Sequence, residues 1–195
     1  MADAEFPWPV QDRFLELHSR WLTLIGEHLQ DHQGNVLEYW RIEKADSVIV
    51  LPLLDPDMAG GERHLLLPAR SYRPGVGAAT LDFPGGRVAA DQNREQGAIA
   101  ILQRELGFAA DRIRQMAPLN AEGWPVNSSF SNQRLYGFVA HLHNAPNAGN
   151  HQVAVTYPAT AVGIQQLLQQ LTCLQCRAVL LEWWWRDGGK QRQTR

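Results

Sequence analysis

The residues with the clearest chemical potential lie between positions 81 and 108, LDFPGGRVAADQNREQGAIAILQRELGF, where a glycine pair leads into a helical pattern. Gly85 and Gly86 have no Cβ, so they can bring backbone close to a phosphate or a metal ion, or they can form a tight turn after Pro84. The helical stretch carries few of the carboxylates that a metal-assisted phosphate site usually needs. The segment therefore indicates either an active phosphate-handling enzyme or the scaffold of one that has lost its chemistry.

Two cysteines, Cys173 and Cys176, form a single CxxC pair. With no second pair and no histidine at finger spacing, this pair is at most half of a zinc site. A redox CxxC normally begins a helix after a strand, because the helix N-terminus lowers the pKa of the first thiol. The flanking residues, QQLTCLQCRAVLLEWW, predict instead a helix that continues through both cysteines. We therefore favour a structural role for the pair over a functional one.

The composition limits the classes of partner. The chain has 195 residues, 45% of them hydrophobic and 19% charged, as expected for a globular protein with one full-sized core. Its net charge of -2 gives no reason to expect binding to nucleic acid or to an anionic membrane, so a small molecule or a protein is the expected partner. The first residues do not resemble a secretory leader, and the longest apolar run, SVIVLPLL, is too short to cross a bilayer as a helix. We expect a soluble, cytoplasmic protein.

The first eighty residues are predicted to be rich in strands. Residues 11–19 are predicted to form a short helix, with Phe14, Leu15 and His18 near one face. The stretch from 20 to 55 has apolar runs broken at Gly26 and at DHQGN, which indicates consecutive antiparallel strands. A further strand is expected in ERHLLLPARSYR.

From Asn93 the apolar period becomes helical. Asn93 is expected to cap a helix over residues 94–106, and Gly107 is expected to end it. APLNAEGW and QRLYGFVAHLH predict strands on either side of a polar loop, and residues 159–185 predict helical structure. The tryptophans at 183–185 should point in different directions, so that only part of the cluster packs the core. This order of elements indicates α/β or α+β layers.

The central stretch is similar to the Nudix box, whose pattern is a glycine, a spaced glutamate, an Arg-Glu pair, two further glutamates and a final glycine. The preceding SYR and LDFPGG resemble the QYR-like and LELPAG segments of the ADP-ribose and nucleoside-diphosphate-sugar pyrophosphatase branch. The likeness covers about residues 20 to 145, including GNVLEYWRIEKADSVIVLPLL and GWPVNSSFSNQRLYGFVAHL. It implies a Nudix-type mixed β-sheet layered between helices, with N-terminal antiparallel strands. Residues 1–45 would then form an extension that supports a homodimer, and residues 46–195 the Nudix-like domain.

The box aligns without a gap from Gly86 to Gly107-Phe108, and in that register most of its acidic residues are replaced. Gln92 takes the place of the first glutamate, and Ala100 takes the place of the arginine. Ile101 and Arg104 replace two further glutamates. Glu105 alone is retained. The alternative register, which takes Arg104-Glu105-Leu106 as the Arg-Glu element, requires an insertion of four residues and then offers no glutamate pair.

Helix geometry gives the consequence for metal binding. Residues at i, i+3 and i+4 share a face, which here is Ile101, Arg104 and Glu105. Glu105, as the one catalytic and metal-binding residue carried over, should hold Mg²⁺ only weakly. Arg104 would repel the cation and pair with Glu105, or would bind a phosphate through its paired donors. Ala100 and Ile101 give an inward face that suits packing.

The resemblance also implies a set of ligand contacts: Arg73, Gly85, Gly86, Arg87 and Arg104. Arg73 is expected to contact a phosphate or sugar, with a surface salt bridge as the alternative. Four acids could in principle replace the lost glutamates: Asp82, Asp91, Glu95 and Glu122. Of these, Asp91 is expected in the turn before the helix, and Asp82 is expected to face either the pocket or a strand neighbour.

Three functions therefore remain open. The first is a Nudix-fold protein that binds a nucleotide or a nucleotide-sugar diphosphate with its hydrolase site degenerate. The second is a working Mg²⁺-dependent pyrophosphatase acting on ADP-ribose-like substrates with displaced acids. The third is a protein-interaction module without a small ligand.

Overall fold

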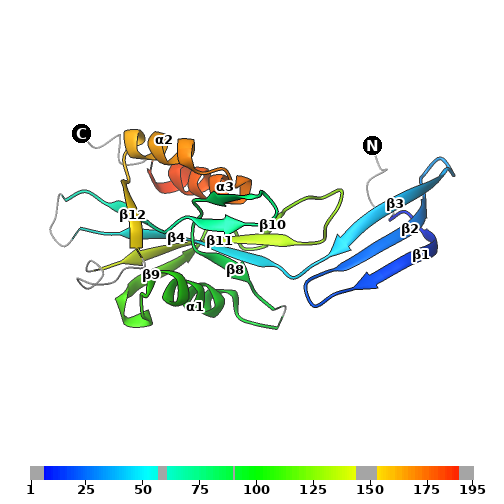
Figure 1. Cartoon of the computed structure of the whole chain (residues 1–195), viewed down its shortest axis with the longest axis horizontal. Helices are drawn as coiled ribbons and strands as arrows, with labels where there is room; N and C mark the ends of the chain where they lie inside the picture. Colours follow the sequence, from blue (N-terminus) through cyan, green and yellow to red (C-terminus); the bar gives the residue numbers. More distant parts are fainter. Residues whose placement is uncertain (1–6, 57–60, 90, 144–152, 189–195) are drawn as a thin grey trace. The chain divides into compact units, whose positions relative to one another are not determined.

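A computed structural model describes residues 7–56, 61–89, 91–143 and 153–188. The chain divides into two compact units, one formed by Met1–Ala45 with Pro125–Arg134 and the other by Asp46–Trp124 with Leu135–Arg195. Figure 1 shows both units and labels most of their elements. Among the described residues, no helix combines the length and the apolar character needed to cross a membrane.

The first unit is a three-stranded antiparallel sheet of β1 (Val10–His18), β2 (Thr23–Gln30) and β3 (Val36–Glu43). The prediction of a helix over residues 11–19 is wrong, because this segment pairs with β2 along its whole length. Hydrogen bonding to the next strand along the chain outweighs the weak helical pattern. Gly26 does not break a strand either, since it lies within β2. A Cβ there would meet the Phe14 ring at 2.5 Å, so the glycine lets the ring lie over the sheet.

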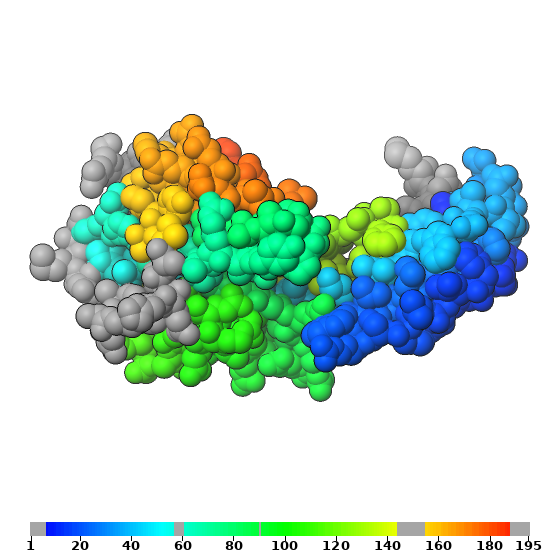
Figure 2. Space-filling model, in the orientation of Figure 1, coloured from blue at the N-terminus to red at the C-terminus, as the bar shows by residue number. Residues whose placement is uncertain are grey.

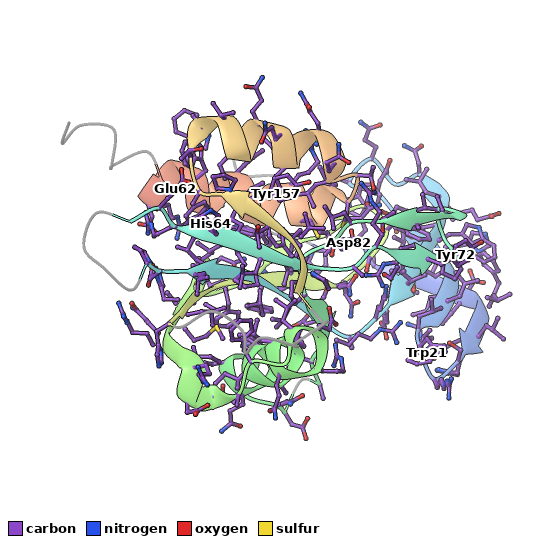
Figure 3. The ribbon with its side chains drawn as sticks, turned by 60° about the vertical axis from the view of Figure 1, so that its left-hand side comes forward. Trp21, Glu62, His64, Tyr72, Asp82 and Tyr157 are labelled. Atoms are coloured by element: carbon purple, nitrogen blue, oxygen red, sulfur yellow. The ribbon has the colours of Figure 1, made fainter. Side chains whose placement is uncertain are left out.

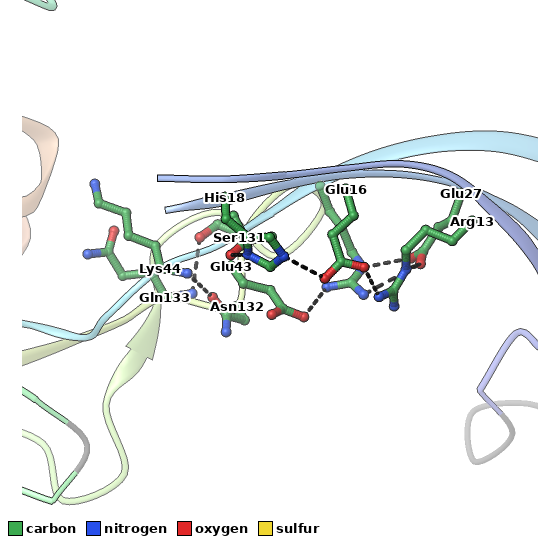
Figure 4. Close-up of polar contacts among 11 residues, drawn as sticks. Arg13, Glu16, His18, Glu27, Glu43, Lys44, Ser131, Asn132 and Gln133 are labelled. Carbon is green, nitrogen blue, oxygen red and sulfur yellow. Dashed lines mark hydrogen bonds and ion pairs between the residues drawn. The ribbon is translucent and has the colours of Figure 1, made fainter. Parts of the chain in front are cut away.

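One carboxylate is buried in this unit, and it is ion-paired. Glu27 is 2% exposed, and its Oε1 accepts from Arg41 Nε at 2.6 Å. Arg13 Nε lies 3.6 Å from the other oxygen, which places the charge between two guanidinium groups (Figure 4). A buried carboxylate is tolerated when it is paired in this way. The loop after Pro125 is tied to the same unit, because the Lys44 amide donates to Asn132 Oδ1 at 2.9 Å.

The second unit is built on a seven-stranded mixed sheet. Its main path runs β10-β11-β4-β5-β12, with β8 paired to β4 and β9 paired to β11. The strand bounds are β4 Ser47–Leu54, β5 His64–Pro68, β8 Gly85–Arg87, β9 Ile113–Pro118, β10 Trp124–Pro125, β11 Arg134–Leu142 and β12 Val153–Pro158. β11 pairs with β4 in parallel, whereas β5 and β8 pair with β4 antiparallel. A separate hairpin joins β6 (Ser71–Arg73) to β7 (Ala78–Thr80).

Helices cover both faces of this sheet (Figure 1). α1 (Arg94–Leu106) packs on one face, and a 3-10 turn (Ala110–Arg112) follows it. α2 (Ala161–Gln170) and α3 (Leu174–Trp183) lie on the other face, where their orange and red atoms gather in Figure 2. A short π-helical turn, Trp184–Gly188, follows α3.

β4 supplies the centre of the core, with every residue from Val48 to Leu53 buried. Such a run is typical of a strand covered on both faces. Trp183 is fully buried and Trp185 is 80% exposed, which confirms that the tryptophan cluster divides between core and surface. The predicted mixed sheet between helices is therefore the observed fold.

Candidate functional site

Helix α1 is positioned by a cap at each end. The side-chain oxygen of Asn93 accepts hydrogen bonds from the amides of Glu95 and Gln96, which satisfies two donors that a helix start leaves unpaired. Gly107 takes the left-handed conformation, with φ 71°, and its amide closes the last turn. The predicted bounds of this helix and both of its capping residues are confirmed.

The face of α1 that meets the sheet is apolar. Ile101 is 3% exposed and belongs to the main core cluster, together with Val48 and Val50 of β4. Ala100, in contrast, is exposed. The expectation that Ala100 shares the inward face is wrong, because one residue along a helix is a turn of about 100° and moves the side chain out of the contact. Of Ala100 and Ile101, it is therefore Ile101 that packs against the sheet.

The glycine pair lies in β8, directly against β4 and α1. Gly85 pairs with Ile49 and Gly86 with Val48. A Cβ at Gly86 would lie 3.2 Å from Arg104 Nη2 and 3.3 Å from Ile101 Cδ1. Glycine at this position therefore allows a close approach between the strand and the helix.

Arg104 and Glu105 reach from α1 to this glycine turn. Arg104 Nη2 donates to Glu105 Oε1 at 2.7 Å and to the Gly85 carbonyl at 3.3 Å. The Gly85 amide donates to Glu105 Oε2 at 3.3 Å. Both carboxylate oxygens of Glu105 are thus engaged, one by a guanidinium and the other by the backbone. The structure therefore brings Gly85, Gly86, Arg104 and Glu105 together in one cluster.

The other two predicted contact residues lie differently. Arg87 is exposed at the end of β8. Arg73 belongs to a second cluster, since its Nε donates to Asp82 Oδ2 at 2.8 Å. Thr80 Oγ1 donates to the same oxygen at 2.7 Å. Arg73 therefore forms the salt bridge that was the alternative to a ligand contact, and Asp82, labelled in Figure 3, faces a strand neighbour.

The second cluster includes the CxxC pair. The prediction of one helix through both cysteines is wrong, because α2 ends at Gln170 and α3 begins at Leu174, with Cys173 as its N-cap. Cys176 is buried one turn into α3, and its Sγ lies 3.9 Å from Asp82 Oδ1. No glycine or proline marks this break between helices, so no local signal predicts it.

The two thiols differ in their acidity. The pKa of Cys173 is lowered to about 6, first because the Cys176 thiol donates a hydrogen bond to it and then because backbone amides at the start of α3 face it. The pKa of Cys176 is raised, because the same hydrogen bond keeps its proton and because burial disfavours a thiolate. Cys173 is half-buried and is the more accessible of the two.

The acids considered as replacements for the lost glutamates do not gather at Glu105. Asp91 lies exposed in the turn before α1, as predicted. Glu95 and Glu122 are also exposed. Among the described residues, three side chains of the types that bind metals converge on one point: Asp82, Cys173 and Cys176. Glu105 does not belong to this group.

Comparison with known proteins supports the fold. No family model matches the sequence, and no curated protein matches it. A solved structure described as the crystal structure of an ADP compounds hydrolase matches with a TM-score of 0.72 at 18% sequence identity. The match covers 95% of this chain and 96% of that one. Because the likeness extends over nearly the whole length of both chains, this protein has the mixed α/β fold of the Nudix type.

Proposed function

We propose that this protein binds the diphosphate of a nucleotide or nucleotide sugar at the Gly85–Arg104 cluster and hydrolyses it slowly or not at all. The main support for the proposal is that both carboxylate oxygens of Glu105 already accept hydrogen bonds, one from Arg104 and the other from the Gly85 amide. Ile101 supports it, since a buried aliphatic side chain stands where the resemblance implies a carboxylate. The similar solved structure is described as acting on ADP compounds, which makes a nucleoside diphosphate the first ligand class to test.

Magnesium is the cofactor that the resemblance implies, and the surroundings of Glu105 fit it poorly. Mg²⁺ requires near-octahedral oxygen coordination, usually with one or two carboxylates, water and substrate phosphate. Glu105 is the one carboxylate carried over from the box, and a permanently charged guanidinium lies 2.7 Å from it. The proposal therefore assigns no metal-dependent step to this site.

A phosphate group can instead be bound by Arg104. The side chain is 60% exposed, so a ligand can reach the guanidinium from solvent. A guanidinium binds two phosphate oxygens through parallel N–H donors. Glycine at 86 keeps the adjoining backbone close to the guanidinium.

The hydrolysis arm of the test is phosphate release coupled to alkaline phosphatase. The substrates are ADP-ribose and a panel of nucleotide sugars, each in Mg²⁺ and in Mn²⁺, with the wild type compared with Glu105→Gln. We expect turnover at or close to the blank. Turnover well above the blank that disappears in Glu105→Gln would contradict the proposal and would support the second function, a working pyrophosphatase.

The binding arm is calorimetry with ADP-ribose and the same panel of nucleotide sugars, in the presence and absence of EDTA. We expect an affinity that EDTA does not change and that falls about 10- to 100-fold in Arg104→Ala, since a hydrogen bond to a charged group contributes about 1.5–3 kcal/mol. Arg114→Ala is the matched control, because Arg114 is 63% exposed and also lies beside a carboxylate, Asp55. If no ligand of the panel binds, the nucleotide proposal fails and a protein-interaction module remains.

We also propose that the protein is a homodimer through its first unit. Large apolar side chains are exposed there: Trp8, Val10, Phe14, Leu17, Trp21, Val36, Leu37 and Trp40. Exposed apolar groups at this density are typical of interaction surfaces. Light scattering should give the mass of two chains, and Leu17→Asp should shift it toward one, whereas Val76→Asp, at a similarly exposed position in the second unit, should not. A monomeric wild type would refute the dimer.

A further inference from the structure

The second cluster brings three metal-ligating side chains to one point from distant parts of the chain. The ligand atoms of Asp82, Cys173 and Cys176 all lie within 4.8 Å of one another. The two cysteines occupy the N-cap and third positions of α3, one helical turn apart, so their side chains point to the same side. Asp82 approaches from the segment between β7 and β8.

We propose that Asp82, Cys173 and Cys176 form a binding site for a thiophilic divalent cation of the zinc class. Thiolates select zinc-like ions over Mg²⁺ and Ca²⁺, and two thiolates with one carboxylate are within the ligand set that zinc accepts. Three protein ligands leave the fourth tetrahedral position for water or for a bound molecule. The proposal stands independently of nucleotide binding at the Gly85–Arg104 cluster.

One edge of the site, from Cys176 Sγ to Asp82 Oδ1, is close to the length that a tetrahedral zinc site requires. With zinc–sulfur and zinc–oxygen distances of about 2.3 and 2.1 Å, the sulfur and oxygen of neighbouring ligands lie about 3.6 Å apart. The observed distance from Cys176 Sγ to Asp82 Oδ1 is 3.9 Å. Side-chain shifts of well under an ångström would therefore complete this edge of the site.

The surroundings of Asp82 also resemble those of a metal ligand. Arg73 and Thr80 both donate to Oδ2, and the facing oxygen, Oδ1, is the one directed at Cys176. Hydrogen bonds of this kind orient a ligating carboxylate. The Asp82 side chain is only 12% exposed, so its position is fixed by packing as well.

The charges balance when a divalent cation is present. Two thiolates and the Asp82 carboxylate would carry three negative charges, of which Arg73 compensates one. A divalent cation compensates the other two and displaces the thiol protons, as metal binding to cysteine requires. A dithiol–disulfide couple, in contrast, would form its bond between the two sulfurs and would use Asp82 only as a proton acceptor for the Cys176 thiol.

The test is metal binding by the full-length protein, purified under reducing conditions and stripped with a chelator. Zinc is added in competition with a chromophoric chelator, and cobalt is added separately to report thiolate ligands through the thiolate-to-cobalt charge-transfer band. We expect one equivalent of zinc and a charge-transfer intensity that corresponds to two thiolates. Cys173→Ser should halve that intensity, and Cys173 is half-buried, so this variant should fold.

Asp82→Asn tests the third ligand. It should weaken zinc binding by at least about 100-fold, because even partners one shell away from a metal change its affinity 10- to 100-fold. Asp55→Asn is the matched control, since Asp55 is 15% exposed and is also paired with basic side chains, but it lies outside the cluster. Circular dichroism of each variant checks that the fold is retained.

Three results would overturn the proposal. The first is a reduced wild type that binds no zinc at micromolar concentration. The second is an affinity that Asp82→Asn lowers no more than Asp55→Asn does. The third is a protein that binds zinc poorly but forms a Cys173–Cys176 disulfide with oxidised glutathione and returns it to the dithiol with a reductant, which would assign the pair to redox chemistry.

Discussion

Restoring the family's carboxylate at Ile101 should damage the protein rather than repair it. Ile101 is 3% exposed in the core between α1 and β4. Replacing it with glutamate forfeits about 1.5–3 kcal/mol of apolar burial. The new carboxylate adds a burial cost of several kcal/mol, part of which it avoids by taking up a proton. We expect Ile101→Glu to lower the free energy of unfolding at pH 8 by about 4 kcal/mol or more.

Ala100→Glu provides the matched comparison. It introduces the same carboxylate one residue away on the same helix, but position 100 is exposed. Its effect should stay within about 0.5 kcal/mol. Urea denaturation followed by circular dichroism measures both variants.

The pH dependence of Ile101→Glu sharpens the test. Burial raises the pKa of the new carboxyl in the folded state, so the folded protein holds its proton more tightly than the unfolded chain does. The loss of stability should therefore shrink as the pH falls from 8 towards the ordinary pKa of glutamate, about 4.3. Two results would refute the conclusion that this face of α1 is packed into the core: a loss of unfolding free energy below about 1 kcal/mol, or a specific recovery of stability on addition of Mg²⁺.

Three further predictions concern local features. Gly163→Ala should destabilise the protein by about 3 kcal/mol in urea denaturation, because a Cβ there would lie 2.0 Å from the Pro158 carbonyl oxygen. Gly75→Ala, where nothing lies within 4 Å, should be close to neutral, and equal effects of the two changes would contradict the packing. Asn93→Ala should cost about 1 kcal/mol by the same measurement through loss of the helix cap, and no change would show that the cap contributes nothing. In the metal-free, reduced protein, the rate of alkylation of Cys173 should fall as the pH drops through about 6, since the thiolate reacts and the thiol does not. A midpoint near the ordinary thiol pKa of about 8.5 would contradict this prediction.

The sequence predicts structure most reliably where interactions within a few residues determine it. Asn93 and Gly107 each satisfy backbone groups within their own helical turn, so the helix between them could be placed at both ends. The segment from 11 to 19 does not form the predicted helix, because its conformation depends on hydrogen bonds to the neighbouring strand β2, which its own apolar spacing does not reveal. The break before Cys173 is not predicted either, since no residue there forbids a continuing helix.

The candidate site was only partly predictable. Arg104 and Glu105 are close to Gly85 because α1 packs beside β8, and the resemblance supplied that arrangement. The neighbourhood of Asp82 and Cys176 could not be anticipated, because the two residues are 94 positions apart and no pattern links them. Local periodicity gives faces and ends of elements, whereas contacts between remote segments follow only from the assembled fold.

The parallel pairing of β4 with β11 has a consequence for biosynthesis. Ser47 pairs with Leu135, which leaves the ribosome about 90 residues later, or about 5–18 s at ordinary elongation rates. During that interval the apolar run from Val48 to Leu53 has only its antiparallel neighbours β5 and β8 available, and the nascent chain cannot complete its sheet. Chains that terminate before residue 134 should therefore remain unfolded and aggregate, and chaperones should be needed most while the central third of the chain is being made.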